Sequence, residues 1–334
     1  MSSALSERRN HALDFTKGAL VLLMVLYHWF NYFVSTVGPV YTYLRFVTPS
    51  FIFLAGFLIT NIYPSRYDFE YLSVSRRLFN RGIKLLALYT ALNVLANLVF
   101  SASYRGSMPG VEGFFGMADK IYISGNAKSL FWVLLPISYL LLIVSGLFLL
   151  GRGNLRPVHI SCWAAMAAVF LFNSRLMPSA NLEMLAIGLL GAVCGTYPIA
   201  RINGLVSHTL GIGVLYFSYT MIVAIVGVPF SLQVIGVVLN VTVIYLIGLK
   251  QLFVERVYNE VALLGQYSLL GYIAQIGILH ILRQLFMRIE LSVVLVWALS
   301  FGAVVALTIV IVKGVDISRK KSSALRSLYG MVFS

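Results

Sequence analysis

Residues 13–31 have the sequence LDFTKGALVLLMVLYHWFN, and this stretch decides the fold class of the chain. Lys17 stands near its polar start, and residues 19–26 are all apolar before His28 is reached. In an α-helix His28 would lie about 16 Å above Lys17 and only about 20° away around the axis. A helix that places Lys17 at the edge of a hydrocarbon core about 30 Å thick therefore places His28 near the middle of a membrane.

An imidazole at that depth is costly to bury, so His28 is a candidate functional residue by default. Asp14 and Asn31 fall near the same stripe of the helix. The alternative is a neutral structural histidine whose ring nitrogens are satisfied by a neighbouring helix.

The composition supports a membrane protein. The chain has 334 residues, of which 60% are hydrophobic and 11% are charged, with a mean hydropathy of +0.89. Soluble domains carry about a quarter charged residues, and no polar stretch here is long enough to fold one. We therefore predict an all-α, polytopic membrane protein with a single integral membrane domain over residues 1–334. Cys162 and Cys194 lie in apolar runs and indicate neither a disulfide nor a metal site.

Apolar runs separated by proline, glycine and polar residues predict about ten transmembrane helices within residues 15–313, followed by a cytoplasmic tail over 314–334. No cleaved signal peptide is expected before the first helix. The predicted helices span residues 15–34, 46–63, 81–101, 129–150, 157–173, 182–198, 204–227, 232–250, 261–284 and 291–313.

An even number of helices places both termini on one side of the membrane. That side receives 18 of the 25 lysines and arginines, and the opposite side receives seven. Basic loops face the cytoplasm, so both termini are predicted to be cytoplasmic in a multi-pass protein of the cell (inner) membrane. The net charge of +14 is explained by these loops and does not imply nucleic acid as a partner.

One basic cluster lies on the side of the membrane that is predicted to carry both termini, in the run SRRLFNRGIK at residues 75–84. If this run is helical, Arg77, Arg81 and Lys84 share one face, and Arg76 lies about a quarter-turn away. These side chains either anchor the protein to anionic lipid headgroups or bind a phosphate-rich cytosolic ligand, because guanidinium groups grip phosphate bidentately.

The other polar features have two interpretations each. The long connection at 102–128 is either a lid or spacer, or a weakly indicated carbohydrate-binding segment. Glu183 at the start of a predicted helix is either favoured by the helix dipole or part of a substrate site. His280 is expected at the outer interface. Three polar residues lie in the predicted ninth helix, namely Ser268, Tyr272 and Gln275. They either form hydrogen bonds between helices or bind substrate.

Four pieces in this order resemble the membrane acyltransferase-3 family. The stretch LDFTKGALVLLMVLYH is similar to the family's LDxLRGxAxLxVVxxH, with Lys17 in place of the arginine and His28 as the histidine. The run FIFLAGFLIT at 51–60 is similar to FFxLSGFLI, with Ala55 in place of serine. Lysine keeps the charge of arginine but lacks its planar fork.

The third piece is the arginine-rich run at 75–84. The fourth is LLGQYSLLGYIAQI at 263–276, which resembles LGxISYxLYLxH with Gln275 where a histidine is common. The motifs cover about a fifth of the chain, and the ten-helix layout extends the resemblance to almost all of it. The residues of the second motif favour the branch of the family that modifies glucans.

The resemblance implies transfer of an acyl group, of the acetyl or succinyl class, from cytosolic acyl-CoA to a hydroxyl of an extracytoplasmic or lipid-linked saccharide. His28 would act as general base or carry the acyl group. Lys17 would stabilise developing charge, and Tyr27 and Asn31 would orient the imidazole. The CoA phosphates would be held by Arg76, Arg77, Arg81 and Lys84. Substrate-binding candidates are Asp14, Glu183, Ser268, Tyr272 and Gln275.

The rival function is a transporter or flippase for a saccharide or lipid, with His28 as a proton relay. Such proteins show inverted repeats and paired broken helices, and neither is visible in this sequence. A scaffold without catalysis has little support. No permanently bound cofactor or metal is expected, the lipid bilayer is the expected surrounding, and the oligomeric state is left open.

The charge asymmetry makes a prediction about topology. In a chain without Cys162 and Cys194, a single cysteine introduced at Ser322 should react with a membrane-impermeant thiol reagent only after the cytoplasmic side is opened. The reason is that the terminal side carries most of the basic residues. Labelling of intact cells at this position would contradict the predicted orientation.

Overall fold

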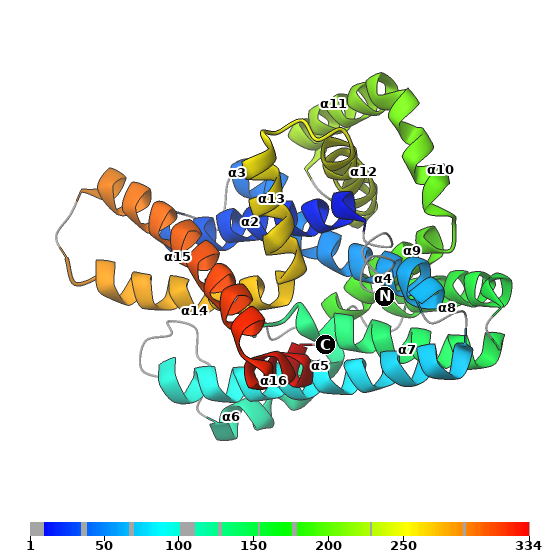
Figure 1. Ribbon diagram of the computed structural model, residues 1–334, viewed down its shortest axis with the longest axis horizontal. Coiled ribbons are helices and arrows are strands. Elements are labelled where there is room, and N and C mark those ends of the chain that lie inside the picture. The colour runs from blue at the N-terminus through cyan, green and yellow to red at the C-terminus, as the bar shows by residue number, and fades with distance from the viewer. Residues whose placement is uncertain are drawn as a thin grey trace. The chain divides into compact units, whose positions relative to one another are not determined.

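The computed structural model describes residues 10–34, 39–66, 70–100, 111–125, 129–152, 154–175, 179–227, 229–289 and 292–333. Helices make up 89% of it, and these ranges contain no strand (Figure 1). Eight helices in the described ranges are long and apolar enough to cross a membrane. The prediction of an all-α polytopic membrane protein is confirmed.

The chain divides into two compact units, one formed by residues 1–50 and 202–334 and the other by residues 51–201. The first contains α2 (His11–Phe33), α3 (Pro39–Leu44), η2 (Gly204–His208), α11 (Thr209–Val226), α12 (Phe230–Leu249), α13 (Glu255–Gln266), α14 (Ser268–Phe286), α15 (Val293–Lys321) and α16 (Ser323–Phe333). The second contains α5 (Tyr71–Phe100), α6 (Val111–Gly116), η1 (Asp119–Ser124), α7 (Leu134–Gly151), α8 (Leu155–Arg175) and α9 (Ala180–Gly195). Two helices cross the boundary between the units, α4 (Val47–Arg66) and α10 (Ile199–Asn203).

Helices occur at all ten predicted places, and the largest differences from the predicted boundaries concern α5, α15 and the predicted helix 261–284. The predicted helix 261–284 is two helices, because the backbone leaves helical geometry at Tyr267 (φ −111°, ψ 27°) between α13 and α14. Helix α5 begins at Tyr71, ten residues before the predicted start at 81, so the basic run at 75–84 is helical. Helix α15 continues to Lys321, so the segment after 313 begins as helix and not as a free tail.

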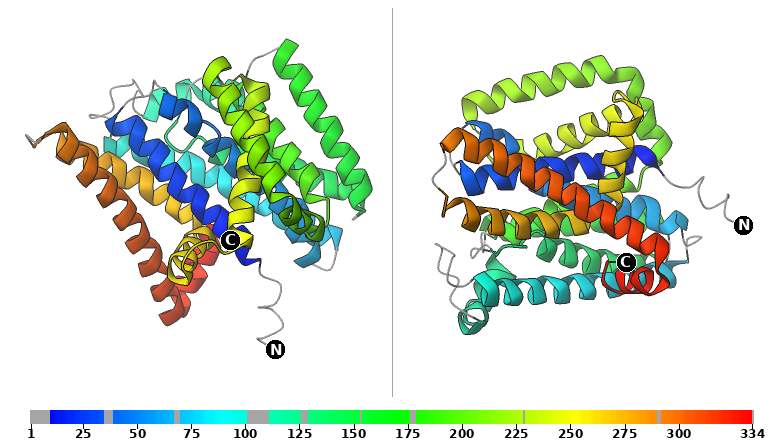
Figure 2. Two further views of the ribbon diagram at one scale, coloured as in Figure 1. Left: turned by 90° about the horizontal axis from the view of Figure 1, so that it is seen from above. Right: turned by 60° about the vertical axis from the view of Figure 1, so that its left-hand side comes forward.

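Helix α2 contacts five helices of the first unit within the described ranges, namely α3, α12, α13, α14 and α15. Figure 2 shows α2 in blue running alongside α14 in orange, with α15 beside the pair. The approach to α13 is the closest, because a Cβ atom on Gly18 would overlap the carbonyl oxygen of Val261, and one on Gly265 would overlap the carbonyl oxygen of Asp14. Small residues allow this backbone contact inside a membrane, where van der Waals packing holds helices together.

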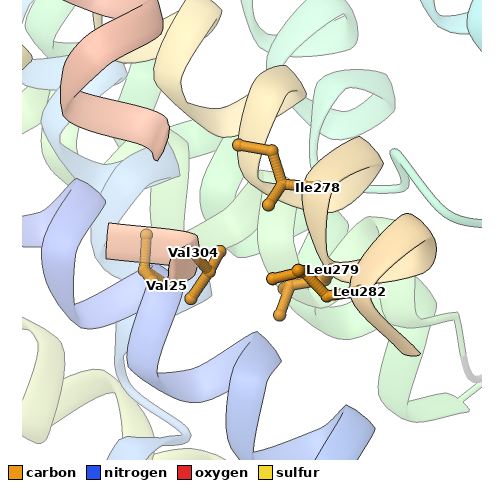
Figure 3. Close-up of a cluster of buried hydrophobic side chains, with 5 residues drawn as sticks. All are labelled: Val25, Ile278, Leu279, Leu282 and Val304. Carbon is orange, nitrogen blue, oxygen red and sulfur yellow. The ribbon is translucent and has the colours of Figure 1, made fainter. Parts of the chain in front are cut away.

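Farther along α2, a buried apolar cluster joins three helices of the first unit. Val25 of α2 packs with Val304 of α15 and with three residues of α14, namely Ile278, Leu279 and Leu282 (Figure 3). Trp29 Nε1 next to this cluster donates a hydrogen bond of 2.8 Å to Ser300 Oγ of α15. The cluster therefore fixes the side of α2 that faces α14 and α15.

The second unit is built around α5 with α7 and around α8 with α9. The part of the 102–128 connection that lies within the described residues is packed onto this unit. Asn181 Nδ2 of α9 donates to the Ile121 carbonyl oxygen at 3.0 Å, and Tyr139 OH of α7 donates to the Tyr122 carbonyl oxygen at 2.6 Å. The η1 segment is thus held by hydrogen bonds from two helices.

The crossing of α2 and α13 gives a prediction about stability. Gly18→Ala should lower the melting temperature of the detergent-solubilised protein, with overpacking costing about 1–3 kcal/mol, although alanine ordinarily favours a helix by about 1 kcal/mol over glycine. The matched control is Gly302→Ala in α15, because a Cβ atom there would meet nothing within 4 Å. Equal melting temperatures for the two variants would contradict the close crossing.

Candidate active site

His28 lies on α2 between aromatic rings of the first unit. Its ring centroid is 5.3 Å from that of Tyr27, edge to face, and 6.2 Å from that of Tyr272 of α14. Within the described part of the chain, His28 Nε2 is buried and has no hydrogen-bond partner. This nitrogen is therefore available to a ligand.

Tyr27 is held by two hydrogen bonds. Its hydroxyl lies 2.9 Å from the hydroxyl of Tyr41 in α3, and the two rings stack with centroids 5.3 Å apart. It also bonds with the side chain of Asn31. Asn31 Oδ1 is itself buried and has no partner among the described residues. Tyr27, His28 and Asn31 therefore lie within four residues of one another on α2.

Two buried acceptor atoms without partners, His28 Nε2 and Asn31 Oδ1, lie one helical turn apart on α2. Leaving a buried polar atom unsatisfied costs about 1–3 kcal/mol. A bound hydroxyl or other donor group would supply the missing hydrogen bonds. The arrangement is therefore suited to a small polar ligand next to the imidazole.

Gln275 of α14 is the third polar side chain of this region. It is fully buried, and both of its amide atoms lack a hydrogen-bond partner among the described residues. It lies between Tyr272, whose ring faces His28, and His280, which bonds Tyr32 of α2. Gln275 is therefore level with the part of α2 between His28 and Tyr32. Ser268 stands half-buried at the start of α14, one turn before Tyr272.

Lys17 is not brought together with His28. Its ammonium nitrogen lies 2.6 Å from Asp14 Oδ1, in an ion pair whose side chains are 22% and 8% exposed. Asp14 is one turn farther from His28 than Lys17 is, so the positive charge is directed away from the imidazole. Burial and the nearby Asp14 raise the pKa of the Tyr258 hydroxyl on α13 above its ordinary value. Asp14 and Lys17 therefore form an ion pair near the N-terminal end of α2, away from His28.

The basic face and Glu183 belong to the second unit, whereas His28 belongs to the first. Arg76, Arg77 and Lys84 of α5 are exposed, and Arg81 is half-buried. The Arg81 guanidinium bonds the Tyr63 hydroxyl and lies 5.9 Å from the centre of its ring.

Glu183 is half-buried in the first turn of α9, which is the position that the helix dipole favours for a carboxylate.

Two features of the site were missed in the sequence. Tyr41 follows a short segment outside the described residues, and no pattern marked it as a partner of Tyr27. His280, which was expected at the outer interface, is only 5% exposed, and its Nε2 lies 2.8 Å from the Tyr32 hydroxyl, a contact that was not predicted. The spacing of four residues between His28 and Tyr32, which places both on one side of α2, was the available signal.

No group of three histidine, cysteine, aspartate or glutamate side chains within the described ranges is arranged to hold a metal ion.

Comparison with known proteins agrees with the geometry. A family model described as an acyltransferase domain matches residues 10–313, which include α2 with His28 and all four motifs. No curated protein and no solved structure gave a match. Since the match covers most of the chain, the protein belongs to the acyltransferase-3 family and is a membrane acyltransferase.

Proposed function

We propose that the protein transfers an acyl group, of the acetyl or succinyl class, from cytosolic acyl-CoA to a hydroxyl of an extracytoplasmic or lipid-linked saccharide. The observation that carries this proposal is the buried, unpartnered Nε2 atom of His28. A charged imidazole is costly inside a membrane, so the ring is held in its neutral form. A neutral imidazole with a free nitrogen is the group that a general base requires.

In the proposed reaction His28 Nε2 accepts the proton of the acceptor hydroxyl as its oxygen attacks the thioester carbon. The carbon–sulfur bond then breaks, and the imidazolium returns the proton to the departing thiolate. The products are an O-acyl ester and free CoA, and His28 ends in its starting form. Asn31 Oδ1 is placed to accept a hydrogen bond from the acceptor, because it is unpartnered one turn away.

Tyr27 has a positioning role in this proposal. Its hydroxyl bonds that of Tyr41 and its side chain bonds Asn31, so Tyr27 restrains the Asn31 side chain one turn from His28. Tyr272 limits the other side of the His28 ring.

Gln275 is the proposed donor of hydrogen bonds to the substrate, since its buried amide lacks a partner among the described residues. Lys17 is neutralised by Asp14 and is left out of the chemical step.

The donor's phosphate groups are proposed to bind the basic face of α5. Arg77 and Lys84 are exposed on the helix, and Arg81 is oriented by Tyr63. Arginine binds phosphate through two parallel hydrogen bonds. The rival function, a transporter with His28 as proton relay, requires no thioester cleavage, so release of CoA thiol by the purified protein separates the two.

The first prediction of this proposal concerns the base. His28→Ala should lower the rate of acyl transfer about 10²–10⁴-fold, measured as release of CoA thiol with saccharide acceptor present. The matched control is His208→Ala, which removes an exposed histidine of η2. If the His28 variant is monodisperse in detergent and transfers at the normal rate, His28 is structural.

The second concerns the donor. Arg77→Ala with Arg81→Ala should weaken CoA binding by roughly tenfold or more, because hydrogen bonds to charged groups contribute about 1.5–3 kcal/mol each. Isothermal titration of CoA onto the detergent-purified protein measures the affinity. The control, Lys250→Ala with Arg256→Ala, removes two exposed charges elsewhere. Equal affinities in the two double variants would remove the basic face from donor binding and leave lipid anchoring as its role.

A further inference from the structure

Helix α16 follows the last membrane-crossing helix after a sharp turn. Ser322 is extended (φ −121°, ψ 123°), so α16 leaves the axis of α15 (Figure 1). The new helix is capped by the same residue, whose Oγ accepts from Leu325 N at 3.4 Å and whose carbonyl oxygen accepts from Arg326 N at 3.1 Å. The chain therefore starts a separate helix directly at the end of a membrane span.

One face of α16 is apolar and open. Leu325, Leu328 and Val332 follow i, i+3, i+7 spacing and share a face, and they are 44%, 56% and 37% exposed. Met331 extends this face and is 66% exposed. The opposite side carries Arg326 and small polar residues. An apolar face opposite a polar one that carries a basic residue is typical of helices that lie in a membrane interface.

The turn into α16 is strongly basic. Arg319, Lys320 and Lys321 end α15, and Arg326 follows in α16. One acidic group lies among them, Asp316, which pairs with Lys320 at 2.6 Å. The segment therefore keeps a net positive charge, which complements the anionic phospholipids of a membrane surface.

Aromatic and cation–π contacts hold α16 against α13 and α15 of the first unit. The Arg319 guanidinium lies 4.0 Å from the centre of the Tyr329 ring and 5.4 Å from that of Tyr267, and the two rings meet edge to face at 5.5 Å. Tyr267 OH also donates to Asp316 Oδ1 at 2.8 Å. Cation–π contacts of this kind contribute about 0.5–2 kcal/mol. The open apolar face is thus presented by a fixed helix.

We propose that α16 lies in the plane of the adjoining membrane leaflet and binds its anionic phospholipids. Leu325, Leu328 and Val332 pack among the upper acyl chains, and the basic residues at the turn lie among the phosphate groups. The leaflet is the favoured occupant because the helix starts where a membrane span ends and because its charge is complementary. This surface is independent of the proposed acyl transfer.

Site-specific fluorescence in vesicles tests the proposal. In full-length protein without Cys162 and Cys194, an environment-sensitive NBD probe is attached to Leu328→Cys on the apolar face or to Ser327→Cys, about 100° away around the helix. A third label at Val310→Cys, in the exposed apolar part of α15 (62% exposed), reports correct insertion. Vesicles contain phosphatidylglycerol with phosphatidylcholine brominated on its acyl chains.

We expect the probe at 328 to be blue-shifted and quenched several-fold more than the probe at 327, and nearly as strongly as the probe at 310. Quenching at 328 should fall when phosphatidylglycerol is omitted, and also in a Lys321→Ala, Arg326→Ala variant. Equal, weak quenching at 327 and 328 would overturn the proposal. A blue shift at 328 without bromine quenching would also overturn it, since a partner protein or second copy would then cover the face. If quenching at 328 is the same with and without phosphatidylglycerol, the proposed preference for anionic lipids is overturned.

Discussion

The backbone contact between α2 and α13 at Gly18 and Gly265 is the constraint on which the first unit depends. Neither position has room for a Cβ atom, because the carbonyl oxygens of Val261 and Asp14 occupy the space. In a bilayer the hydrophobic effect does not drive helices together, so close packing and buried hydrogen bonds must do so. This contact sets the height of α2 relative to α13, and through Tyr267 it sets the height of α14. The opposition of His28 and Tyr272 follows from that register.

The polar groups of α2 are sorted along its length. At its base Lys17 is neutralised by Asp14, and two similar pairs, Lys313 with Glu260 and Lys320 with Asp316, lie toward the same end of α15. Around His28 the pattern reverses, because His28, Asn31 and Gln275 keep buried atoms without partners in the described part of the chain. The ion pairs at that end join charged groups, although Glu260 Oε2 and Arg319 Nε are also buried without partners in the described ranges, whereas the unpartnered atoms around His28 belong to neutral side chains. This separation explains why Lys17 and His28, aligned on one helix, have different roles.

Several features of the fold and the site were predictable from sequence. Periodic apolar runs located all ten helical places, because burial in lipid requires long apolar segments regardless of neighbours. The position of His28 along α2 followed from the rise of one helix. The break at Tyr267 was not predicted, since residues 261–284 form one apolar run that crosses the junction of α13 and α14. The partner of Tyr27 was also hidden, because Tyr41 reaches it from a different helix.

By itself, then, the sequence determined the all-α membrane class, the helical places, the family resemblance and the position of His28 along α2. These depend on spacing within single segments, which fixes rise and direction along a helix. Only the tertiary structure decided that Lys17 pairs with Asp14, that His280 is buried against Tyr32, and that α16 presents an open apolar face. The physical reason is that a side chain's partner depends on which helix packs against it, and that choice is made by contacts between residues far apart in the chain.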